Sequence, residues 1–276
     1  MLQPLTLFRS PKGIVAQRGE DLFLLPGLDF DQVFTQENPA AWLEDQLTHG
    51  QPILAEEKWL APIQNQEVWA SGVTYLRSRD ARMEESKDAG GGTFYDRVYD
   101  ADRPEIFFKA SPHRVVAPGE AVRIRADSQW NVPEPEVTLA INSFGQIFGY
   151  TIGNDMSSRD IEGENPLYLP QAKVYRGCCA LGPGLVVRDP LPADTAIKIE
   201  IARAGTVVFT GETSLTQMKR TFPELAAWLT KEDDFPKGTY LLTGTGLVPP
   251  NDFTLHSGDI VSITIAGLGT LTNPVA

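Results

Sequence analysis

The amino-acid sequence predicts a β-rich α+β protein, with a small N-terminal α+β domain over residues 1–61 and a larger domain over residues 62–276. Apolar residues alternate with polar ones in many short segments, which is the period of half-buried strands. The 21 prolines and 24 glycines are spread along the chain and supply the turns that many short strands need. Two helix-start signals at separate places add the helices of the α+β class.

The N-terminal domain is predicted to combine short strands with one helix. Its strands are expected at residues 5–8, 13–17 and 21–25. Asn38 suits the N-cap of a helix and Pro39 its first position, and the helix is expected to continue to Leu47. Residues 60–63 are expected to form the boundary with the larger domain, which then begins at residues 68–75.

The larger domain is dominated by strand patterns. Further strands are expected at residues 105–109, 121–125, 184–187, 197–202, 206–212 and 259–266. Residues 138–152 are predicted to form a hairpin with a turn at residues 142–145. Thr221 and Glu224 have the spacing of a capping box, which predicts a helix from there to Leu229.

Two glutamates and an aspartate at the ends of the predicted hairpin suggest a metal site. Glu134 and Glu136 are two residues apart in an extended segment, so their side chains point the same way. The hairpin then returns the chain and brings Asp155 beside them. Three carboxylates without a nearby His or Cys favour Mg²⁺, Mn²⁺ or Ca²⁺ over Zn²⁺ and leave coordination positions for water and a chelating substrate.

The alternative interpretation of this pair is the solvent-facing side of an ordinary strand, because one-sided sheets show the same alternation. Pro133 and Pro135 each lack an N–H group and would be unusual inside a central ladder. We therefore expect the segment to lie at an edge or rim of the sheet.

Composition and charge exclude some classes of partner. The formal net charge of −12 gives no electrostatic basis for binding nucleic acid or an anionic membrane. The first thirty residues contain no continuous apolar run, so we expect neither a signal peptide nor a spanning helix, and a cytoplasmic protein. Cys178 and Cys179 are adjacent, which disfavours a disulfide between them. Buried structural thiols are expected, with redox sensitivity as the alternative.

Residues 77–103 form a densely charged segment that contains three consecutive glycines at residues 90–92. One interpretation is a solvated loop. The other is a lid over the site, because long polar segments in compact domains are often functional. Glu84 and Glu85 are the only glutamates of this segment.

Several motifs of the larger domain together carry a family resemblance. They are residues 68–75, 103–109, 134–136, 149–160, 242–245 and the glycine-rich residues 258–271. In this order they resemble the fumarylacetoacetate hydrolase superfamily over about residues 62–275. Residues 98–101 and 162–175 are similar to the branch of 2-keto-3-deoxy-D-arabinonate (pentonate) dehydratases.

The resemblance implies a mixed β-roll catalytic domain in which Glu134, Glu136 and Asp155 bind Mg²⁺, with Mn²⁺ as an alternative ion. It implies a small-molecule 2-keto acid substrate whose carboxylate and keto oxygen chelate the ion. The implied reaction is dehydration of 2-keto-3-deoxy-D-pentonate to 2,5-dioxopentanoate in sugar-acid catabolism. A homodimer or homotetramer is also implied.

Two residues are implied to act in catalysis. Lys173 matches a site lysine of the family and would act as a base or as a cation beside the developing enolate. Its alternative is a surface lysine on a loop. Glu105 would carry the proton to the departing hydroxyl, and its alternative is a salt bridge with Lys109.

Further residues are implied to bind the substrate. Arg159 matches a family position near the substrate, with a structural pair to Asp160 as the alternative. Gly244 and Thr245 would offer backbone N–H groups and a hydroxyl to the substrate carboxylate, since glycine lets the main chain approach an anion closely. Glu84 and Glu85 are assigned to substrate binding from the charged segment.

The competing function is a metal-dependent hydrolase or decarboxylase of a related diketo acid or acylpyruvate. Hydrolases of this superfamily are expected to activate water with a His and Glu pair whose His comes from the lid, yet residues 77–103 contain no His. His49, His113 and His256 are interpreted as ordinary surface or packing residues. A catalytically silent metal-binding domain would predict a broken set of carboxylates, whereas all three are present.

Overall fold

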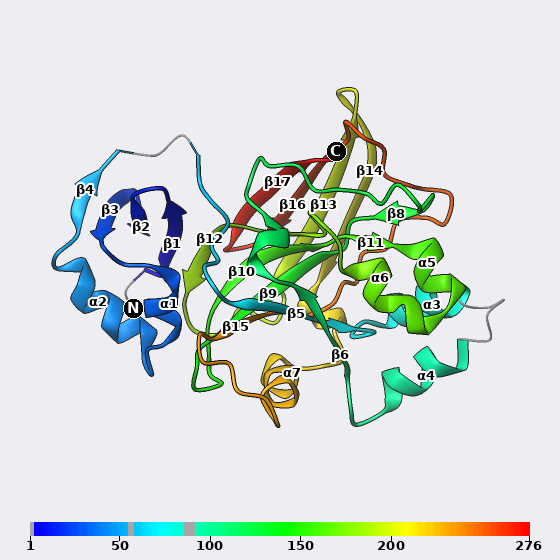
Figure 1. The fold of residues 1–276 in the computed structure, drawn as a ribbon, viewed down its shortest axis with the longest axis horizontal. Coiled ribbons are helices and arrows are strands. Elements are labelled where there is room, and N and C mark those ends of the chain that lie inside the picture. Colours follow the sequence, from blue (N-terminus) through cyan, green and yellow to red (C-terminus); the bar gives the residue numbers. More distant parts are fainter. Residues whose placement is uncertain (1–2, 55–57, 86–91) are drawn as a thin grey trace.

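The computed structural model describes residues 3–54, 58–85 and 92–276 and consists of two packed sheets flanked by short helices (Figure 1). Among these residues, eleven strands form one large mixed sheet and four form a second, antiparallel sheet. The large sheet follows, in spatial order, β4 (Gln51–Ile53), β3 (Asp21–Pro26), β2 (Gly13–Arg18), β1 (Leu5–Ser10), β12 (Cys179–Val187), β10 (Ile147–Asp155), β9 (Pro135–Ile141), β15 (Thr239–Leu242), β5 (Glu67–Gly72) and β6 (Glu105–Ala110), with β7 (Val115–Val116) beside β12.

The remaining elements are the strands of the second sheet, one short pair of strands, and the helices. The second sheet runs β14 (Thr206–Ser214), β13 (Ala196–Arg203), β16 (Ile260–Ile265) and β17 (Gly269–Pro274), and β8 (Asn131–Val132) pairs with β11 (Ser157–Ser158). The helices are α1 (Phe30–Phe34), α2 (Pro39–Leu47), α3 (Leu76–Glu85), α4 (Gly92–Asp100), α5 (Arg159–Glu164), α6 (Leu169–Lys173) and α7 (Phe222–Leu229), with short 3₁₀ turns η1 (Pro112–Arg114), η2 (Pro166–Tyr168) and η3 (Leu215–Gln217). The longest described helix has ten residues, so the described helices are too short to span a bilayer.

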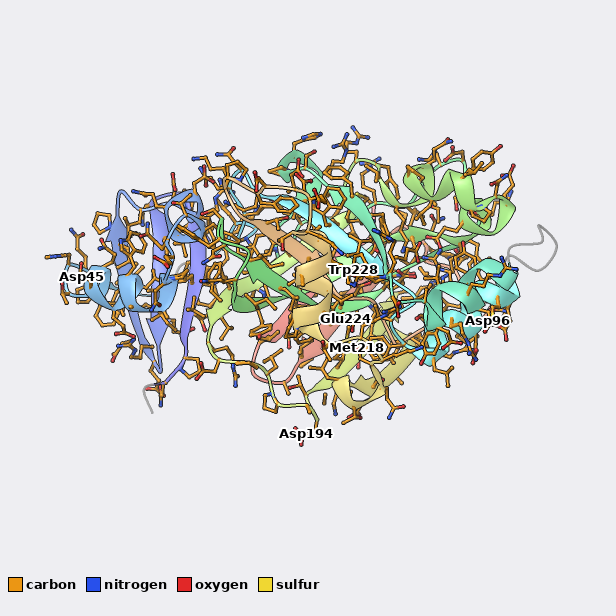
Figure 2. The ribbon with its side chains drawn as sticks, turned by 90° about the horizontal axis from the view of Figure 1, so that it is seen from below. Asp45, Asp96, Asp194, Met218, Glu224 and Trp228 are labelled. Carbon is orange, nitrogen blue, oxygen red and sulfur yellow. The ribbon has the colours of Figure 1, made fainter. Side chains whose placement is uncertain are left out.

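The predicted N-terminal strands and helix are confirmed, and they extend the large sheet. β1 pairs antiparallel with β12, with Leu5 opposite Val187, so β4 to β1 continue the sheet of the rest of the chain. Figure 2 shows the two ends of the molecule: Asp45 lies on α2 at one end and Asp96 on α4 at the other. The division at residues 60–63 stays a prediction.

The main core lies between the two sheets. Val137, Leu139 and Ile141 on one face of β9 pack with the alternating isoleucines of β13 and with strand β16. Each fully buried aliphatic side chain contributes about 1.5–3 kcal/mol to folding. A second apolar cluster covers the opposite face of the large sheet and includes Ala140 and Leu242. Residues of even number on β9 therefore face away from the inter-sheet core, which positions Glu136.

Both predicted helix starts are confirmed, because their caps satisfy otherwise unpaired backbone N–H groups. Asn38 accepts a hydrogen bond from the Ala41 N–H at 3.1 Å at the start of α2. At α7, Thr221 accepts from the Glu224 N–H at 3.3 Å and Glu224 accepts from the Thr221 N–H at 3.4 Å. Such a cap is worth about 1 kcal/mol. Figure 2 shows α7, with Glu224 and Trp228, across the middle of the molecule.

The expected strand at residues 121–125 is wrong. Val122 forms only an isolated bridge, donating to Pro274 O at 3.0 Å and accepting from Ala276 N at 2.9 Å. The next N–H group, of Arg123, turns to Gly177 O at 3.0 Å. Because successive backbone groups bond to different segments, no continuous ladder forms.

The charged segment at residues 77–103 is largely helical where it is described, so its interpretation as a loop is wrong. α3 and α4 pack against each other, with Arg79 3.6 Å from Asp96. Arg220 holds the C-terminal end of α4 by donating to the Asp102 carbonyl at 3.0 Å. Of the triple glycine, residues 90 and 91 lie outside the described residues, and Gly92 is the first residue of α4.

Cys178 and Cys179 are both fully buried and free, as predicted for structural thiols. Cys179 begins β12, and burial holds the pKa of its thiol well above the ordinary value. A thiol that resists ionisation is a poor nucleophile, so the structure favours a packing role over redox sensitivity.

Candidate metal centre and active site

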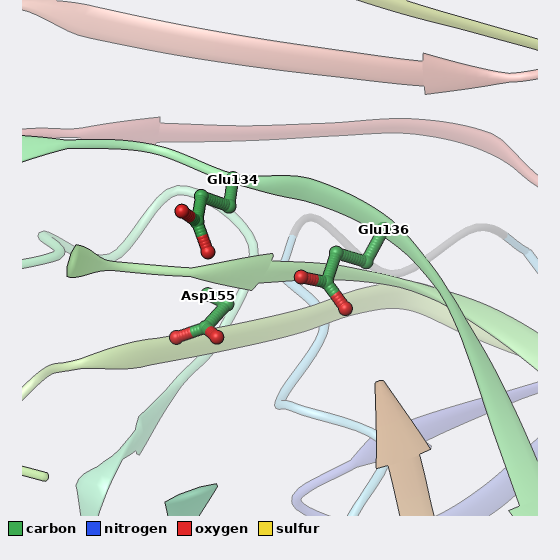
Figure 3. A group of neighbouring side chains, drawn as sticks. All are labelled: Glu134, Glu136 and Asp155. Atoms are coloured by element: carbon green, nitrogen blue, oxygen red, sulfur yellow. The ribbon is translucent and has the colours of Figure 1, made fainter. Parts of the chain in front are cut away.

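Glu134, Glu136 and Asp155 converge in the interior of the protein, as the hairpin prediction required (Figure 3). β9 and β10 pair antiparallel with Gly153 opposite Glu136, and the Asp155 N–H donates to the Glu134 carbonyl at 3.0 Å. One carboxylate oxygen from each residue lies within 4.8 Å of the others. The three residues are 5%, 1% and 1% exposed, so the interpretation as a solvent-facing strand is wrong.

Of the expected edge or rim position, the edge is wrong, because β9 lies between β10 and β15 inside the sheet, whereas Glu134 and Pro135 do lie at the rim, where β9 begins. Pro135 is the first residue of β9, a position where a strand tolerates the missing N–H. Pro133 lies between β8 and β9, outside both strands. The prolines therefore mark the start of an interior strand.

Burial and the neighbouring charges shift the pKa values of the three carboxylates in different directions. Burial, together with repulsion from Asp155 and Glu134, raises the pKa of Glu136 well above its usual value. Burial also raises the pKa of Glu134, although Lys173 opposes the shift. Burial acts on Asp155 too, but Lys109 and Lys173 outweigh it and hold its pKa below the usual value.

This oxygen-only set fits a divalent cation. Mg²⁺ binds oxygen ligands at about 2.0–2.1 Å, so opposite ligands lie about 4.2 Å apart, which the spacing of the triad allows. A cation would favour the ionised form of Glu136, which burial disfavours. The described residues hold no other group of three metal-ligating side chains of this kind.

Lys173 lies in this centre and not on the surface, so its interpretation as a surface lysine is wrong. It is the last residue of α6 and is 1% exposed. Its Nζ lies 2.5 Å from Glu134 Oε2 and 3.0 Å from Asp155 Oδ2, and it also donates to the Ser157 hydroxyl. Burial by itself lowers the pKa of Lys173, but the attraction of Asp155 and Glu134 outweighs it and raises the pKa. Lys173 is therefore cationic here.

Arg159 belongs to the same cluster. It is the first residue of α5, is buried, and its Nη2 lies 3.0 Å from Glu134 Oε1. Burial lowers the pKa of its guanidinium to about 10. The alternative pair with Asp160 is wrong, because Asp160 accepts instead from the Ser128 hydroxyl at 2.5 Å and the Gln129 N–H at 2.7 Å.

Glu105 is the first residue of β6, and its carboxyl group rests over Gly72. A Cβ atom at Gly72 would lie 2.0 Å from Glu105 Oε2, so glycine makes room for the carboxyl. The residue is half-buried, but Oε2 is shielded from solvent, and burial raises the pKa of Glu105 despite the attraction of Arg82 and Lys173. A carboxyl with a raised pKa keeps its proton more readily and suits a proton donor.

The alternative salt bridge between Glu105 and Lys109 is wrong. Lys109 is fully buried and its Nζ pairs with Asp155 Oδ1. The same ammonium group donates to the carbonyls of Met156 at 2.9 Å and Lys173 at 2.6 Å. Lys109 therefore orients Asp155 and ties the end of α6 to the centre.

Gly244 and Thr245 line the centre, but their polar groups have partners within the protein. The Gly244 N–H donates to Glu136 Oε2 at 2.6 Å. Gly244 has a φ of +89°, and a Cβ there would lie 2.0 Å from Thr74 Oγ1, so only glycine fits. The Thr245 hydroxyl accepts from the Leu247 N–H at 3.1 Å. Their assignment to the substrate stays a prediction.

The centre opens into a small cavity of about 20 Å³, which is room for a water molecule. It is lined by the triad and by residues from several elements, namely Ser71, Gly72, Val73, Ser78, Arg82, Phe107, Arg159, Lys173, Gly244 and Thr245. Glu84 is exposed on α3 and is not among the lining residues, and the side chain of Glu85 lies outside what the structure describes. The three histidines are exposed, as predicted.

A sugar acid does not fit in this cavity, so α3 is expected to move when a ligand enters. Hydrogen exchange of residues 77–85 and 92–99 should slow when pyruvate and Mg²⁺ are added, because closure over a ligand protects the backbone. Residues 86–91 of the expected lid lie outside the described residues. The β13–β14 hairpin serves as the internal control, with unchanged exchange. Slow exchange in the free protein that the ligands leave unaltered would show a fixed structural segment.

Four residues of the centre were not predicted from the sequence as functional: Arg82, Lys109, Ser157 and Glu162. Arg82 Nη1 lies 2.5 Å from Glu162 Oε2, and Glu162 Oε1 lies 3.5 Å from Lys173 Nζ. Lys109 carried one usable signal, since it lies on the same face of its strand as Glu105. The sequence contains no signal that singles out Arg82, because it is one of several charged residues on α3.

Comparisons with known proteins identify the family and the relatives that this chain is similar to. The family profile described as "Fumarylacetoacetate (FAA) hydrolase C-terminal" matches residues 68–276. The chain is 49% identical over 216 residues to a probable 2-keto-3-deoxyxylonate dehydratase of Haloferax volcanii, covering 78% of this chain and 73% of that protein. It is 48% identical over 217 residues to a 2-dehydro-3-deoxy-D-arabinonate dehydratase of Saccharolobus solfataricus, with the same coverage.

A solved structure extends the likeness to nearly the whole chain. It is described as 2-keto-3-deoxy-D-arabinonate dehydratase complexed with magnesium and 2,5-dioxopentanoate. It superposes with a TM-score of 0.84 at 36% identity and covers 99% of this chain and 98% of its own. The β-rich mixed-sheet fold expected from the sequence is thereby confirmed.

Proposed function

Since the chain belongs to the fumarylacetoacetate hydrolase family, we propose that it is a magnesium-dependent dehydratase of 2-keto-3-deoxy sugar acids. Its substrate is 2-keto-3-deoxy-D-pentonate (arabinonate) and its product is 2,5-dioxopentanoate. The observation that carries the proposal is the buried carboxylate triad with Lys173 inside it. Dehydratases that act on such acids are 48–49% identical to this chain.

The triad Glu134, Glu136 and Asp155 holds the ion, and Mn²⁺ meets the same ligand preferences. Mg²⁺ held there would supply a Lewis acid that stabilises negative charge on the 2-keto oxygen. Arg82, Arg159 and Lys173 offset the charge of the carboxylates around the cavity, so that a bound divalent ion would make the site locally positive in a protein whose formal net charge is −12. This local charge is what an anionic keto acid requires.

In the proposed reaction Lys173 removes the C3 proton of the substrate. In the structure it is a cation, because Asp155 and Glu134 raise its pKa. A divalent ion on these carboxylates would weaken their hold on the ammonium proton and lower the pKa of Lys173, which would favour loss of that proton before the amine takes the proton from C3. Lys173 therefore depends on the ion for its protonation state.

In the proposed reaction Glu105 protonates the C4 hydroxyl as it leaves. Its raised pKa keeps the proton available, and its carboxyl group lies against Gly72, which lines the cavity. Loss of the C3 proton and the C4 hydroxyl as water gives an unsaturated acid that tautomerises to the dioxo product. Arg159, with its guanidinium beside Glu134, orients the substrate carboxylate.

Hydrolysis or decarboxylation of a related diketo acid or acylpyruvate is the weaker candidate. The described histidines are exposed and none lines the cavity with the triad. No His lies in residues 77–103, so the His and Glu pair expected of the hydrolases has no source there. A homodimer or homotetramer and a cytoplasmic location stay predictions.

The reaction class is tested with purified protein, Mg²⁺ and 2-keto-3-deoxy-D-pentonate. We expect 2,5-dioxopentanoate to form, detected as NAD(P)H production through a coupled aldehyde dehydrogenase, because the site can remove a proton and stabilise the enolate. Acylpyruvates serve as the comparison substrates. Faster cleavage of an acylpyruvate than dehydration of the sugar acid would assign the protein to the hydrolases.

A further inference from the structure

Lys173 contacts two of the carboxylates that a divalent cation in the triad would bind. Its Nζ lies 2.5 Å from Glu134 Oε2 and 3.0 Å from Asp155 Oδ2. A divalent ion needs oxygens of the same two carboxylates, and two cations so close together repel each other strongly in a buried site. When the ion binds, the ammonium group must therefore give up part of these contacts.

Glu162 offers Lys173 an alternative partner. Among the ion pairs of the described residues, it is the carboxylate outside the triad that Lys173 contacts, with Oε1 3.5 Å from Nζ. It lies on α5 and is 1% exposed, so water does not screen this attraction. Glu162 is not part of the carboxylate group that could hold a metal.

Arg82 of α3 fixes Glu162 in this position. Its Nη1 lies 2.5 Å from Glu162 Oε2, so the two oxygens of Glu162 face two different cations. Burial by itself raises the pKa of Glu162, but Arg82 and Lys173 outweigh it and hold the pKa below its usual value. Glu162 is therefore ionised, and Oε1 is directed at Lys173.

We propose that Glu162 is a positioning residue that draws the Lys173 ammonium group out of the triad, so that Lys173 and a divalent cation occupy the centre together. The inference rests on the proposed function for the identity of the ion and for the task of Lys173. Glu162 itself touches neither ion nor substrate. Without its charge, Lys173 stays on Glu134 and Asp155 and competes with the ion.

Calorimetric titration of the whole, metal-free protein with Mg²⁺ alone tests this competition. Glu162→Gln keeps the shape of the side chain and removes its charge, and it should weaken Mg²⁺ binding by about tenfold or more. In a Lys173→Met background the same change should weaken binding by less than about threefold, because the competitor is gone. Glu162→Asp keeps the charge and should bind Mg²⁺ within about threefold of the unaltered protein.

Glu164→Gln is the matched control, because Glu164 is an exposed glutamate on the same helix, and its Mg²⁺ affinity should be unchanged. Thermal unfolding checks that each variant is folded, and if Glu162→Gln does not fold, a loss of affinity in Glu162→Asp beyond tenfold overturns the proposal. Equal weakening in both backgrounds would show a general charge effect and overturn it. An unaltered Mg²⁺ affinity in Glu162→Gln would also overturn the proposal. Loss of Mg²⁺ binding in the single variant Lys173→Met would overturn it as well.

These results separate the inference from the proposed function. Turnover of the sugar acid by the unaltered protein is measured apart from the titrations. Mg²⁺ binding with the expected coupling but no dehydration would contradict the proposed reaction and leave the role of Glu162 intact. Dehydration of the sugar acid without the coupling between Glu162 and Lys173 would support the proposed reaction and contradict the role of Glu162.

Discussion

Replacing Glu136 by glutamine is expected to abolish Mg²⁺ binding and turnover while the fold is retained. The side chain keeps its shape but loses the negative charge that faces Asp155 and Glu134. Loss of one of three anionic ligands should weaken Mg²⁺ binding by more than about 100-fold, since even residues that only support a ligand cost 10–100-fold. Turnover of the variant should be as low as that of the unaltered protein treated with EDTA. Addition of Mg²⁺ or Mn²⁺ should restore turnover in the unaltered protein but not in the variant.

The stability of the metal-free variant provides a second measurement. The folded-state pKa of Glu136 is raised, so the folded protein binds more protons than the unfolded chain, and this group costs stability as pH rises above its unfolded pKa. At neutral pH in EDTA, Glu136→Gln should therefore unfold at a temperature no lower than the unaltered protein. Glu120→Gln, on the surface beside Lys58, is the matched control with unchanged binding. Full activity in the chelator would refute the metal requirement.

Lys173→Met is expected to lower kcat by about 10²–10⁴-fold, the usual contribution of a positioned acid or base. Mg²⁺ should bind at least as tightly as in the unaltered protein, because Lys173 no longer competes for Glu134 and Asp155. A large loss in kcat with retained ion binding is the signature of a group that acts on the substrate. Steady-state kinetics and Mg²⁺ titration on the same preparation measure both.

Lys198→Met is the control for this variant, because Lys198 lies on β13 with an exposed side chain paired with Glu212. Its kcat should be unchanged. A kcat for Lys173→Met within about tenfold of the unaltered protein would exclude it as the base and leave proton removal to another group of the centre.

The two errors in the predicted elements have the same origin. The pattern at residues 121–125 is that of a strand, but no partner runs alongside it, and its backbone groups bond to residues 177, 274 and 276. Residues 77–103 are polar, yet α3 and α4 are stabilised by packing against each other and by Arg82, which is buried against Glu162. Local patterns identify what a segment can form, whereas long-range partners select what it does form.

The sequence by itself determined most of the expected strands, the two helix caps and the meeting of the three carboxylates at one hairpin. Each of these depends on neighbours along the chain: the alternation of a strand, the reach of a capping side chain, or the return of one hairpin. The family resemblance implied Lys173 and Arg159, but only the tertiary structure showed that Lys109 and Arg82 also accompany the triad and which carboxylate each cation contacts. Lys109, Lys173 and Arg82 come from β6, α6 and α3, and they meet the carboxylates because the fold packs these elements around the end of β10. Buried charges are balanced by partners that are close in space, and separation along the chain does not determine that distance.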